Sequence, residues 1–358
     1  GGAVAAPGGG GGAGSPGPAS SSPPSQAPRG GKGGIVSEDV RARVEALRAE
    51  IRRHEHLYYV LARPEISDQA FDLLMAELRR LEAEQFDVLV VGGGSAGICA
   101  AAASGRAGAK TVLVEQASQV GGNTTIGGVN FPGLFHAWGR QVIAGVGWEL
   151  VSKTVAEAGG VLPDFAKPAG REHWRHQVTV NIPLFVALAE ELLGKAGVAI
   201  HYHAAPMRIE QTSGGWRVTT AAVGDTRVIA CRQIVDCSGD GAVAGLLGLE
   251  RMRGEECQPG SFAYTLRPNA DLAALDAKAL QARFEEAVKA GVLQRTDCRW
   301  GVAHFLKEGG GVGNYVVGAD SSDADGRTEA NLRGRASMLR MFRWLKTVPG
   351  LEPAEHAK

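Results

Sequence analysis

The sequence predicts an α/β protein with a parallel β-sheet and a β-meander, preceded by an α-helical hairpin and a disordered tail. Residues 86–116 run through an apolar strand, a Gly-rich turn, a helix and a second strand, the order of a parallel βαβ unit. Residues 37–85 carry apolar side chains at helical spacing on both sides of Pro64. Residues 1–36 are mostly Gly, Pro, Ala and Ser, and such a segment cannot bury enough apolar surface to become ordered.

The βαβ unit has the features of a dinucleotide-binding site. Residues 88–91 form an apolar run typical of a strand buried on both faces, and Gly92-x-Gly94-x-x-Gly97 follows it directly. In this motif Gly92 permits the tight turn, Gly94 lets a pyrophosphate approach the backbone, and Gly97 lets helix and strand pack closely. We expect phosphate oxygens to be bound by the free N–H groups at the helix start, which belong to Ser95, Ala96 and Gly97.

An acidic residue lies at the end of the second strand, residues 111–114. Glu115 follows Gly97 by 18 residues, at a position where a carboxylate can accept hydrogen bonds from an adenosine ribose. A Gly-rich turn in another α/β fold is the alternative interpretation. The ordered series of strand, glycines, helix, strand and acid favours a Rossmann-type FAD/NAD(P)-binding sheet.

A second Gly- and Thr-rich segment, residues 121–130, distinguishes FAD from NAD. A simple NAD dehydrogenase has no need of such a loop after the acid. FAD extends past its pyrophosphate, and its ribityl chain and isoalloxazine ring need backbone and hydroxyl donors. We therefore expect FAD as the cofactor, with the flavin half contacted by Gly121, Gly122, Thr124 and Thr125.

From residue 86 onward the chain resembles the two-dinucleotide-binding flavoproteins, especially the FAD-dependent oxidoreductases related to the flavin subunit of heterodisulfide reductase. The segments that carry the resemblance after residue 130 are 130–151, 182–204 and 233–248. It implies that a turn near Pro206 and Met207 offers backbone groups to the adenine. It also implies that a strand end crosses under the FAD, at Ser238, Gly239 and Asp240. An ordinary strand–turn–helix is the alternative for that last segment.

Further strands are expected at residues 198–202, 216–220, 226–231 and 233–237, and a long helix at 327–345. Turns at residues 214–215 and 224–225 indicate that the strands 216–220 and 226–231 belong to a β-meander. We expect an FAD-binding domain over residues 86–250 and a substrate-side region over 251–358. The resemblance implies that relatives continue past this region. We therefore expect the substrate-side region to be incomplete and the chain to bind FAD weakly. The start at Gly1 likewise suggests an incomplete or processed reading frame.

The catalytic residues are less well defined, because the flavin itself carries the redox chemistry. His136, in a segment with Asn130 and Trp138, is our candidate acid or base, since an imidazole titrates near neutral pH. A structural or surface histidine is the equally open alternative. Residues 171–176 and 309–315 are candidates to line a substrate pocket, with Arg175 suited to a carboxylate.

The hairpin resembles the small N-terminal domain of bacterial NAD-dependent DNA ligases. Ser37 and Ser67 are expected to cap its two helices. In the ligase family this module contacts the nicotinamide mononucleotide half of NAD; the matching positions here are Tyr58, Tyr59, Asp68 and Asp72. Phe71 stands where the family usually has Tyr. No KxDG motif, zinc-binding cysteines or helix-hairpin-helix repeats follow, so we expect an idle fused or misassembled fragment; a spacer or an oligomerisation element is the alternative.

Composition narrows the possible partners. With 38 basic and 38 acidic residues the formal net charge is zero, which gives no electrostatic reason to expect nucleic acid or a membrane. No apolar run is long enough to span a bilayer, and no secretory signal precedes the first helix. The five cysteines are scattered without a CxxC, and the histidines show no metal-binding spacing, so we expect no metal site and a cytoplasmic location.

We therefore expect an FAD-dependent oxidoreductase acting on a small-molecule substrate, with its oligomeric state left open. Two rival interpretations remain. One is an NAD-binding fragment of a DNA ligase, and the other is a non-catalytic fusion.

Overall fold

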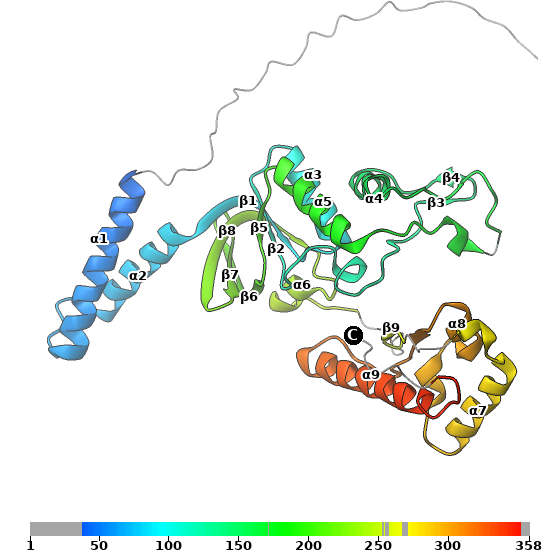
Figure 1. Cartoon of the computed structure of the whole chain (residues 1–358). Helices are drawn as coiled ribbons and strands as arrows, with labels where there is room; N and C mark the ends of the chain where they lie inside the picture. Colours follow the sequence, from blue (N-terminus) through cyan, green and yellow to red (C-terminus); the bar gives the residue numbers. More distant parts are fainter. Residues whose placement is uncertain (1–37, 171, 253, 255–257, 267–270, 352–358) are drawn as a thin grey trace, which may run out of the picture. The chain divides into compact units, whose positions relative to one another are not determined.

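The computed structural model describes residues 38–170, 172–252, 254, 258–266 and 271–351 (Figure 1). The predicted disordered tail, residues 1–36, lies outside the described residues, as does the expected cap Ser37. The chain divides into two compact units, Gly1–Ala83 and Glu84–Lys358.

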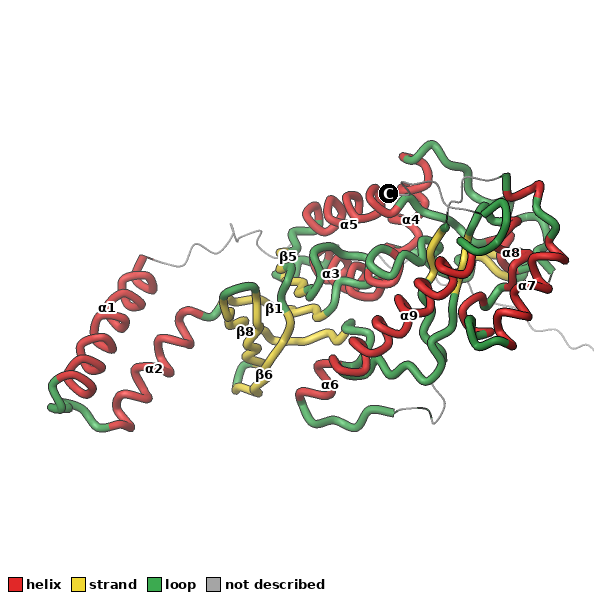
Figure 2. Tube along the Cα trace, turned by 60° about the horizontal axis from the view of Figure 1, so that its bottom comes forward, coloured by secondary structure: helices red, strands yellow, loops and turns green. Residues whose placement is uncertain are grey.

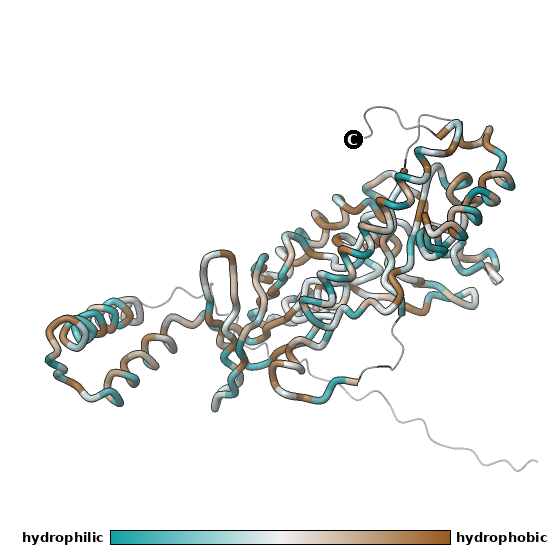
Figure 3. Tube along the Cα trace, turned by 90° about the horizontal axis from the view of Figure 1, so that it is seen from below, coloured by the Kyte–Doolittle hydropathy of each residue, from teal (hydrophilic) through white to brown (hydrophobic). Residues whose placement is uncertain are grey.

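The first unit contains the helical hairpin. Helix α1 (Glu38–Glu55) continues into a π-helical turn, His56–Val60, and α2 (Asp68–Glu82) returns after the break at Pro64. The Ser67 hydroxyl accepts a hydrogen bond from the Ala70 N–H at 3.2 Å, which confirms the predicted cap. Leu47 and Ile51 of α1 are buried between the helices. Figure 3 shows hydrophobic and hydrophilic residues alternating along both helices, as expected for helices that bury one side.

The second unit is built on a six-stranded sheet in the order β5-β2-β1-β8-β7-β6 (Figure 1; yellow in Figure 2). Strands β5, β2, β1 and β8 run parallel, and β8, β7 and β6 form an antiparallel meander. This confirms the predicted parallel sheet with a β-meander. The strands are β1 (Glu84–Val91), β2 (Thr111–Val114), β5 (Ala199–His201), β6 (Ala205–Thr212), β7 (Gly215–Ala222) and β8 (Asp225–Asp236).

Two details of the sheet differ from the expectation. The segments 226–231 and 233–237, predicted as separate strands, form the single long strand β8. Residues 229–231 explain this, because they pair with β1 on one side and with β7 on the other. The first strand also begins at Glu84, where it pairs with Ile229.

Apolar layers cover both faces of the parallel strands. On one face, Val90 and Leu113 pack under α3 (Ser95–Arg106), α5 (Ile182–Lys195) and α4 (Val146–Glu157). On the other, Leu89 and Val112 pack with Val218 of the meander and with α6 (Ala242–Leu246). Neighbouring residues of a strand point to opposite faces, so an unbroken apolar run such as residues 88–91 is required here.

The C-terminal part of this unit has its own core around Phe284, Phe305, Met341 and Trp344. It contains α7 (Ala277–Lys289), α8 (Gly301–Lys307) and α9 (Ala324–Leu345), with an antiparallel pair, β9 (Ala263–Thr265) and β10 (Gly311–Gly313). The Asp323 carboxylate caps α9 by accepting from the Gly326 N–H at 2.7 Å, so this helix begins three residues before the expected Arg327. A second short hairpin joins β3 (His136–Ala137) to β4 (Arg140–Gln141).

Candidate functional site

The Gly-rich turn lies at the carboxyl end of β1, where ligands of open α/β sheets bind. Gly92 has φ = 97°, and a Cβ there would stand 2.4 Å from the Cys237 carbonyl oxygen. A Cβ on Gly97 would stand 1.8 Å from the Gly92 carbonyl oxygen. Both glycines are therefore required by the close approach of β1, α3 and the end of β8.

At Gly94, by contrast, no contact within the described protein requires a glycine. Its φ of −67° suits any residue, and an ideal Cβ there meets no atom within 4 Å. Helix α3 starts at this residue without a side-chain cap, so its first N–H groups, from Ser95 to Gly97, are free to bind an anion. Open space beside an uncapped helix start fits the predicted approach of a pyrophosphate.

Glu115 ties the end of β2 to this turn. Its Oε2 accepts a 2.6 Å hydrogen bond from the Gly93 N–H, and its Oε1 accepts a 2.8 Å bond from the Ala117 N–H. The side chain is buried, with 7 % of its surface exposed. Each carboxylate oxygen can accept more than one hydrogen bond, so these contacts leave acceptor capacity for a ribose hydroxyl.

The second Gly/Thr-rich loop contacts the first. The Gly121 N–H donates to the Gly93 carbonyl at 2.8 Å, and a Cβ on Gly122 would lie 3.0 Å from the Gly94 Cα. The Thr125 hydroxyl donates to the Val120 carbonyl at 2.7 Å, and the side chains of Thr124 and Thr125 are buried. The structure thus brings both predicted loops together, with the Thr125 hydroxyl occupied in holding its own loop.

Asp236, which the sequence analysis missed, organises the predicted strand end at 238–240. Its Oδ1 accepts from the Ser238 hydroxyl (2.6 Å) and backbone N–H (3.1 Å), and its Oδ2 from the N–H groups of Val243 (3.0 Å) and Ala244 (3.2 Å). Burial alone raises the pKa of Asp236, but these hydrogen bonds outweigh it and hold the pKa below its usual range. An acid at a strand end before a turn of small residues was the available signal.

Asp240 also has a partner that the sequence did not indicate. Its carboxylate forms an ion pair with Arg327, in the first turn of α9. The neighbouring Gly239 has φ = 84° and open space around its ideal Cβ position. A ligand that used the Asp240 carboxylate would compete with Arg327 for it.

The predicted turn at Met207 is wrong, because residues 205–212 form strand β6. A bend between β5 and β6 precedes this strand, and there His203 has φ = 52°. The pairing register of β6 shifts between Pro206 and Arg208, so Met207 is an extra residue in the ladder with β7. Its side chain is 55 % exposed. Its backbone role toward an adenine stays a prediction.

His136 lies within an aromatic cluster beside α4. Its ring stacks on Phe165 with centroids 3.7 Å apart, and it meets Trp148 edge-on at 5.1 Å. Burial, with His176 as a second cause, lowers the pKa of His136. Its Nδ1 is buried without a hydrogen-bond partner in the described part of the chain. These contacts hold the ring in place, and its acid–base role stays a prediction.

The four predicted NAD-contacting residues of the hairpin line one pocket. Its volume is about 270 Å³, and its walls include Tyr58, Tyr59, Asp68 and Asp72, together with Phe71. The tyrosine rings lie edge-to-face with centroids 5.0 Å apart. The fold of the hairpin thus brings together residues from the turn after α1 and from the first two turns of α2.

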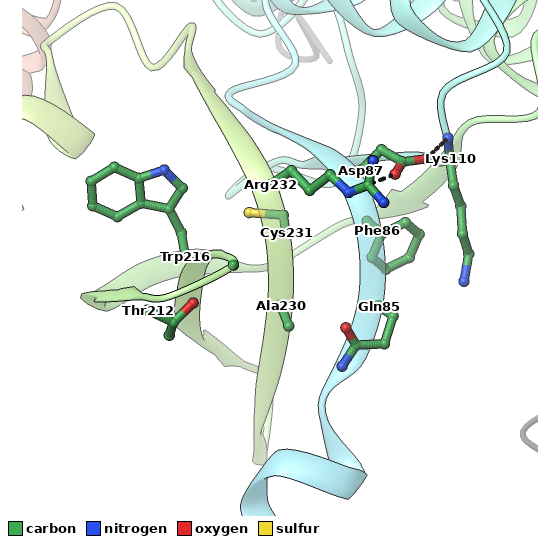
Figure 4. A pocket seen from close by; sticks show the side chains of 10 residues that line it. Gln85, Phe86, Asp87, Lys110, Thr212, Trp216, Ala230, Cys231 and Arg232 are labelled. Carbon is green, nitrogen blue, oxygen red and sulfur yellow. Dashed lines mark hydrogen bonds and ion pairs between the residues drawn. The ribbon is translucent and has the colours of Figure 1, made fainter.

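A larger hollow of about 360 Å³ lies at the opposite, amino end of β1 (Figure 4). Phe86, Trp216 and Arg232 are among its lining residues. Arg232 and the Lys110 backbone N–H both contact the Asp87 carboxylate, at 3.5 Å and 2.9 Å. Dinucleotides bind at the carboxyl ends of such strands, so this hollow is not part of the predicted FAD site.

Within the described residues, no group of three or more His, Cys, Asp or Glu side chains could hold a metal ion. Across the same ranges, no helix is long and apolar enough to cross a membrane. Cys99, Cys231, Cys237 and Cys298 are free thiols, and Cys257 lies outside the described residues.

Residues 87–358 match the family described as FAD dependent oxidoreductase. The chain belongs to this family. Residues 37–91 match the DNA ligase-like N-terminal NAD+-binding domain, so the two matches overlap within β1. These findings confirm the predicted family, with FAD as the cofactor that its description names, and the predicted ligase-like segment.

The similar curated proteins include bacterial DNA ligases. The DNA ligase of Syntrophobacter fumaroxidans is 60 % identical over 53 residues, which are 15 % of this chain and 8 % of the ligase. That of Geobacter metallireducens is 62 % identical over 42 residues, 12 % of this chain and 6 % of the ligase. The chain thus spans less than a tenth of these ligases.

Among solved structures, the OxyS anhydrotetracycline hydroxylase from Streptomyces rimosus is 18 % identical, with a TM-score of 0.36, covering 52 % of this chain and 38 % of that one. The flavin-dependent monooxygenase PieE, solved with FAD and substrate, is 15 % identical with a TM-score of 0.34, covering 52 % and 34 %.

Proposed function

We propose that this member of the FAD-dependent oxidoreductases binds its FAD at the carboxyl ends of β1, β2 and β8 and acts on a small-molecule substrate. The observation that supports this most is the contact between the loops at Gly94 and Gly122, with open space in front of Gly94. Two loops that meet beside an uncapped helix start provide backbone groups for both halves of an extended dinucleotide.

The residues have distinct roles in this proposal. Gly92 and Gly97 shape the turn, and the N–H groups that follow Gly94 bind the pyrophosphate. Glu115 fixes the turn and accepts from the adenosine ribose. When bound, FAD supplies the electron transfer to or from the substrate, while the protein binds, orients and excludes water. His136 is proposed as the group that holds or accepts a proton.

The scattered free thiols support a cytoplasmic location in this proposal, because cytoplasmic proteins keep cysteines reduced. The balanced charge supports a small-molecule partner over nucleic acid or membrane.

The test is flavin content. The purified chain is incubated with excess FAD, freed of unbound flavin, and examined by visible absorption, which NAD does not share. We expect a flavin spectrum from the parent and none from Gly94→Val. A parent chain that retains no flavin after reconstitution would contradict the proposed site.

A second candidate function belongs to the hairpin. We propose that its pocket binds the nicotinamide mononucleotide half of NAD weakly, which is supported by the convergence of Tyr58, Tyr59, Asp68 and Asp72 on one cavity. Phe71 in place of the family's Tyr removes one hydroxyl from that cavity. Calorimetric titration with nicotinamide mononucleotide, carried out on the parent and on Asp72→Ala, tests this proposal. We expect weaker binding by the variant, and equal binding heats from the two proteins would contradict the proposal.

A further inference from the structure

We propose that the C-terminal part of the second unit holds a binding site for a small carboxylate, built around the guanidinium of Arg299. None of the residues that form it, which lie between Ser261 and Tyr315, belongs to the FAD site proposed above. Arg299 follows a short 3-10 turn, Arg295–Cys298, and precedes α8.

The Arg299 guanidinium is held by two aromatic rings. Its central carbon lies 4.2 Å from the ring centroid of Trp300 and 4.7 Å from that of Tyr315. One terminal nitrogen, Nη1, donates to the Ser261 hydroxyl. Contacts of this kind restrict the rotation of the side chain while leaving the edge of the guanidinium plane available for hydrogen bonds.

The remaining donors of Arg299 have no acceptor in the described protein. Its Nε is buried and lacks a hydrogen-bond partner, and no carboxylate of the described residues forms an ion pair with it. Two other arginines of this region do have carboxylate partners: Arg295 pairs with Glu285, and Arg340 pairs with Asp297. A buried Nε without an acceptor is costly, and it shows that the protein itself does not satisfy this guanidinium. The donors left for a ligand are those of the terminal nitrogens.

The backbone that carries this cluster is tied down. The Arg299 N–H donates to the Gly313 carbonyl at 2.8 Å, and the Tyr315 N–H donates to the Thr296 carbonyl at 2.9 Å. A Cβ on Gly313 would lie 2.7 Å from the Trp300 ring, so the indole rests against bare backbone of β10.

Asn314, the residue that follows β10 and precedes Tyr315, is fully buried. Its side chain accepts from the Phe262 N–H at 2.8 Å and donates to the Gly334 carbonyl at 3.0 Å. The arginine and both rings therefore occupy fixed positions before any ligand arrives, which lowers the entropy lost on binding.

The chemistry of the cluster selects the ligand. The terminal Nη1–H and Nη2–H groups of an arginine can face the two oxygens of a carboxylate. The rings of Trp300 and Tyr315 are 43 % and 40 % exposed and offer apolar surface to the carbon skeleton beside it. Arg175, the carboxylate-binding candidate from the sequence, is instead paired with Glu172 on the surface.

The test is calorimetric titration of the full chain with benzoate, with benzamide as the neutral analogue and inorganic phosphate as a tetrahedral anion. We expect saturable binding of benzoate, and affinities for benzamide and phosphate that are weaker by about tenfold or more. Benzamide bound as tightly as benzoate, or no saturable benzoate binding at millimolar concentration, would overturn the proposal. Phosphate bound more tightly than benzoate would overturn the assignment to carboxylates.

Variants can distinguish binding at Arg299 from a general attraction of anions to positive charge. Arg299→Lys keeps the charge and loses the planar pair of donors, so we expect its benzoate affinity to fall about tenfold. The matched control Arg295→Gln removes a cation four residues away and should bind as the parent does. Trp300→Leu keeps the arginine and should weaken binding severalfold, which provides a second test if Arg299→Lys does not fold by circular dichroism. Parent-like affinity in Arg299→Lys or in Trp300→Leu would contradict the proposal.

Discussion

The carboxylate of Glu115 accepts a 2.6 Å hydrogen bond from the backbone N–H of Gly93. This bond joins the end of β2 to the turn that follows β1, and it orients the turn whose next residue, Gly94, faces open space. The acid predicted to contact the ribose is therefore also a structural part of the pyrophosphate loop.

Glu115→Ala should reduce both stability and FAD affinity. It removes two hydrogen bonds to a buried carboxylate, so we expect the free energy of unfolding to fall by about 2 kcal/mol and FAD binding to weaken by about 1–3 kcal/mol. Denaturant unfolding and FAD titration measure the two effects. The control Glu157→Ala removes an exposed carboxylate that pairs with Lys153, and it should change neither quantity by more than about 0.5 kcal/mol.

Gly94 and Gly97 should differ when each is replaced by alanine. A methyl group on Gly94 meets no protein atom, so Gly94→Ala should keep the melting temperature of the apoprotein while FAD affinity falls about tenfold or more. A methyl group on Gly97 would overlap the Gly92 carbonyl, so Gly97→Ala should lower the melting temperature itself. Full FAD affinity in Gly94→Ala would place the pyrophosphate elsewhere.

Asp236→Asn should destabilise the protein in a pH-dependent way. The pKa of this carboxyl lies below its usual 3.8 in the folded state, so its contribution is present above that pH and is lost as the pH falls through the lower folded value. We expect a loss of about 1 kcal/mol at pH 7 from the weaker acceptor. The difference from the parent should shrink in urea titrations at progressively lower pH; a difference that stays constant on acidification would argue against the ionised form.

Arg340→Met should destabilise the C-terminal part strongly. It leaves the fully buried Asp297 without the guanidinium that contacts both of its oxygens, at 3.0 Å and 2.6 Å. Removing one partner of a buried pair costs about 3–5 kcal/mol. Arg295→Gln, which breaks the exposed pair with Glu285, should cost less than about 1 kcal/mol by the same unfolding measurement.

Removal of residues 1–83 should leave flavin binding unchanged, because the second unit begins at Glu84. A longer deletion through residue 85 would take Glu84 and Gln85 from β1, where they pair with Ile229 and Ala230. Flavin content after reconstitution and solubility would be compared for both deletions and the full chain. Loss of flavin in the shorter deletion would show that the hairpin contributes to the site.

Much of the fold follows from local patterns in the sequence. The apolar run at 88–91 and the glycine spacing at 92–97 predicted the first βαβ unit, because burial on both faces and close backbone approach restrict the residue types that are allowed. Ser67 predicted the start of α2 for a similarly local reason, since an N-cap bonds only to the next turn. The ends of strands were less predictable. β8 is one strand because it pairs with β1 on one side and with β7 on the other, and the sequence of β8 does not indicate which strands will be its neighbours.

The sequence by itself determined the class of protein, the Gly-rich turn and the acid of the dinucleotide site, since these depend on residue identity at short spacing. Only the tertiary structure decided which side chains contact one another around these and other sites. The partner of Asp240, Arg327, the partner of Asp297, Arg340, and the contact of Arg299 with Ser261 are all set by folding. The physical reason is that hydrogen bonds and ring contacts depend on distances in space, which residues far apart in the chain acquire only once the core has packed.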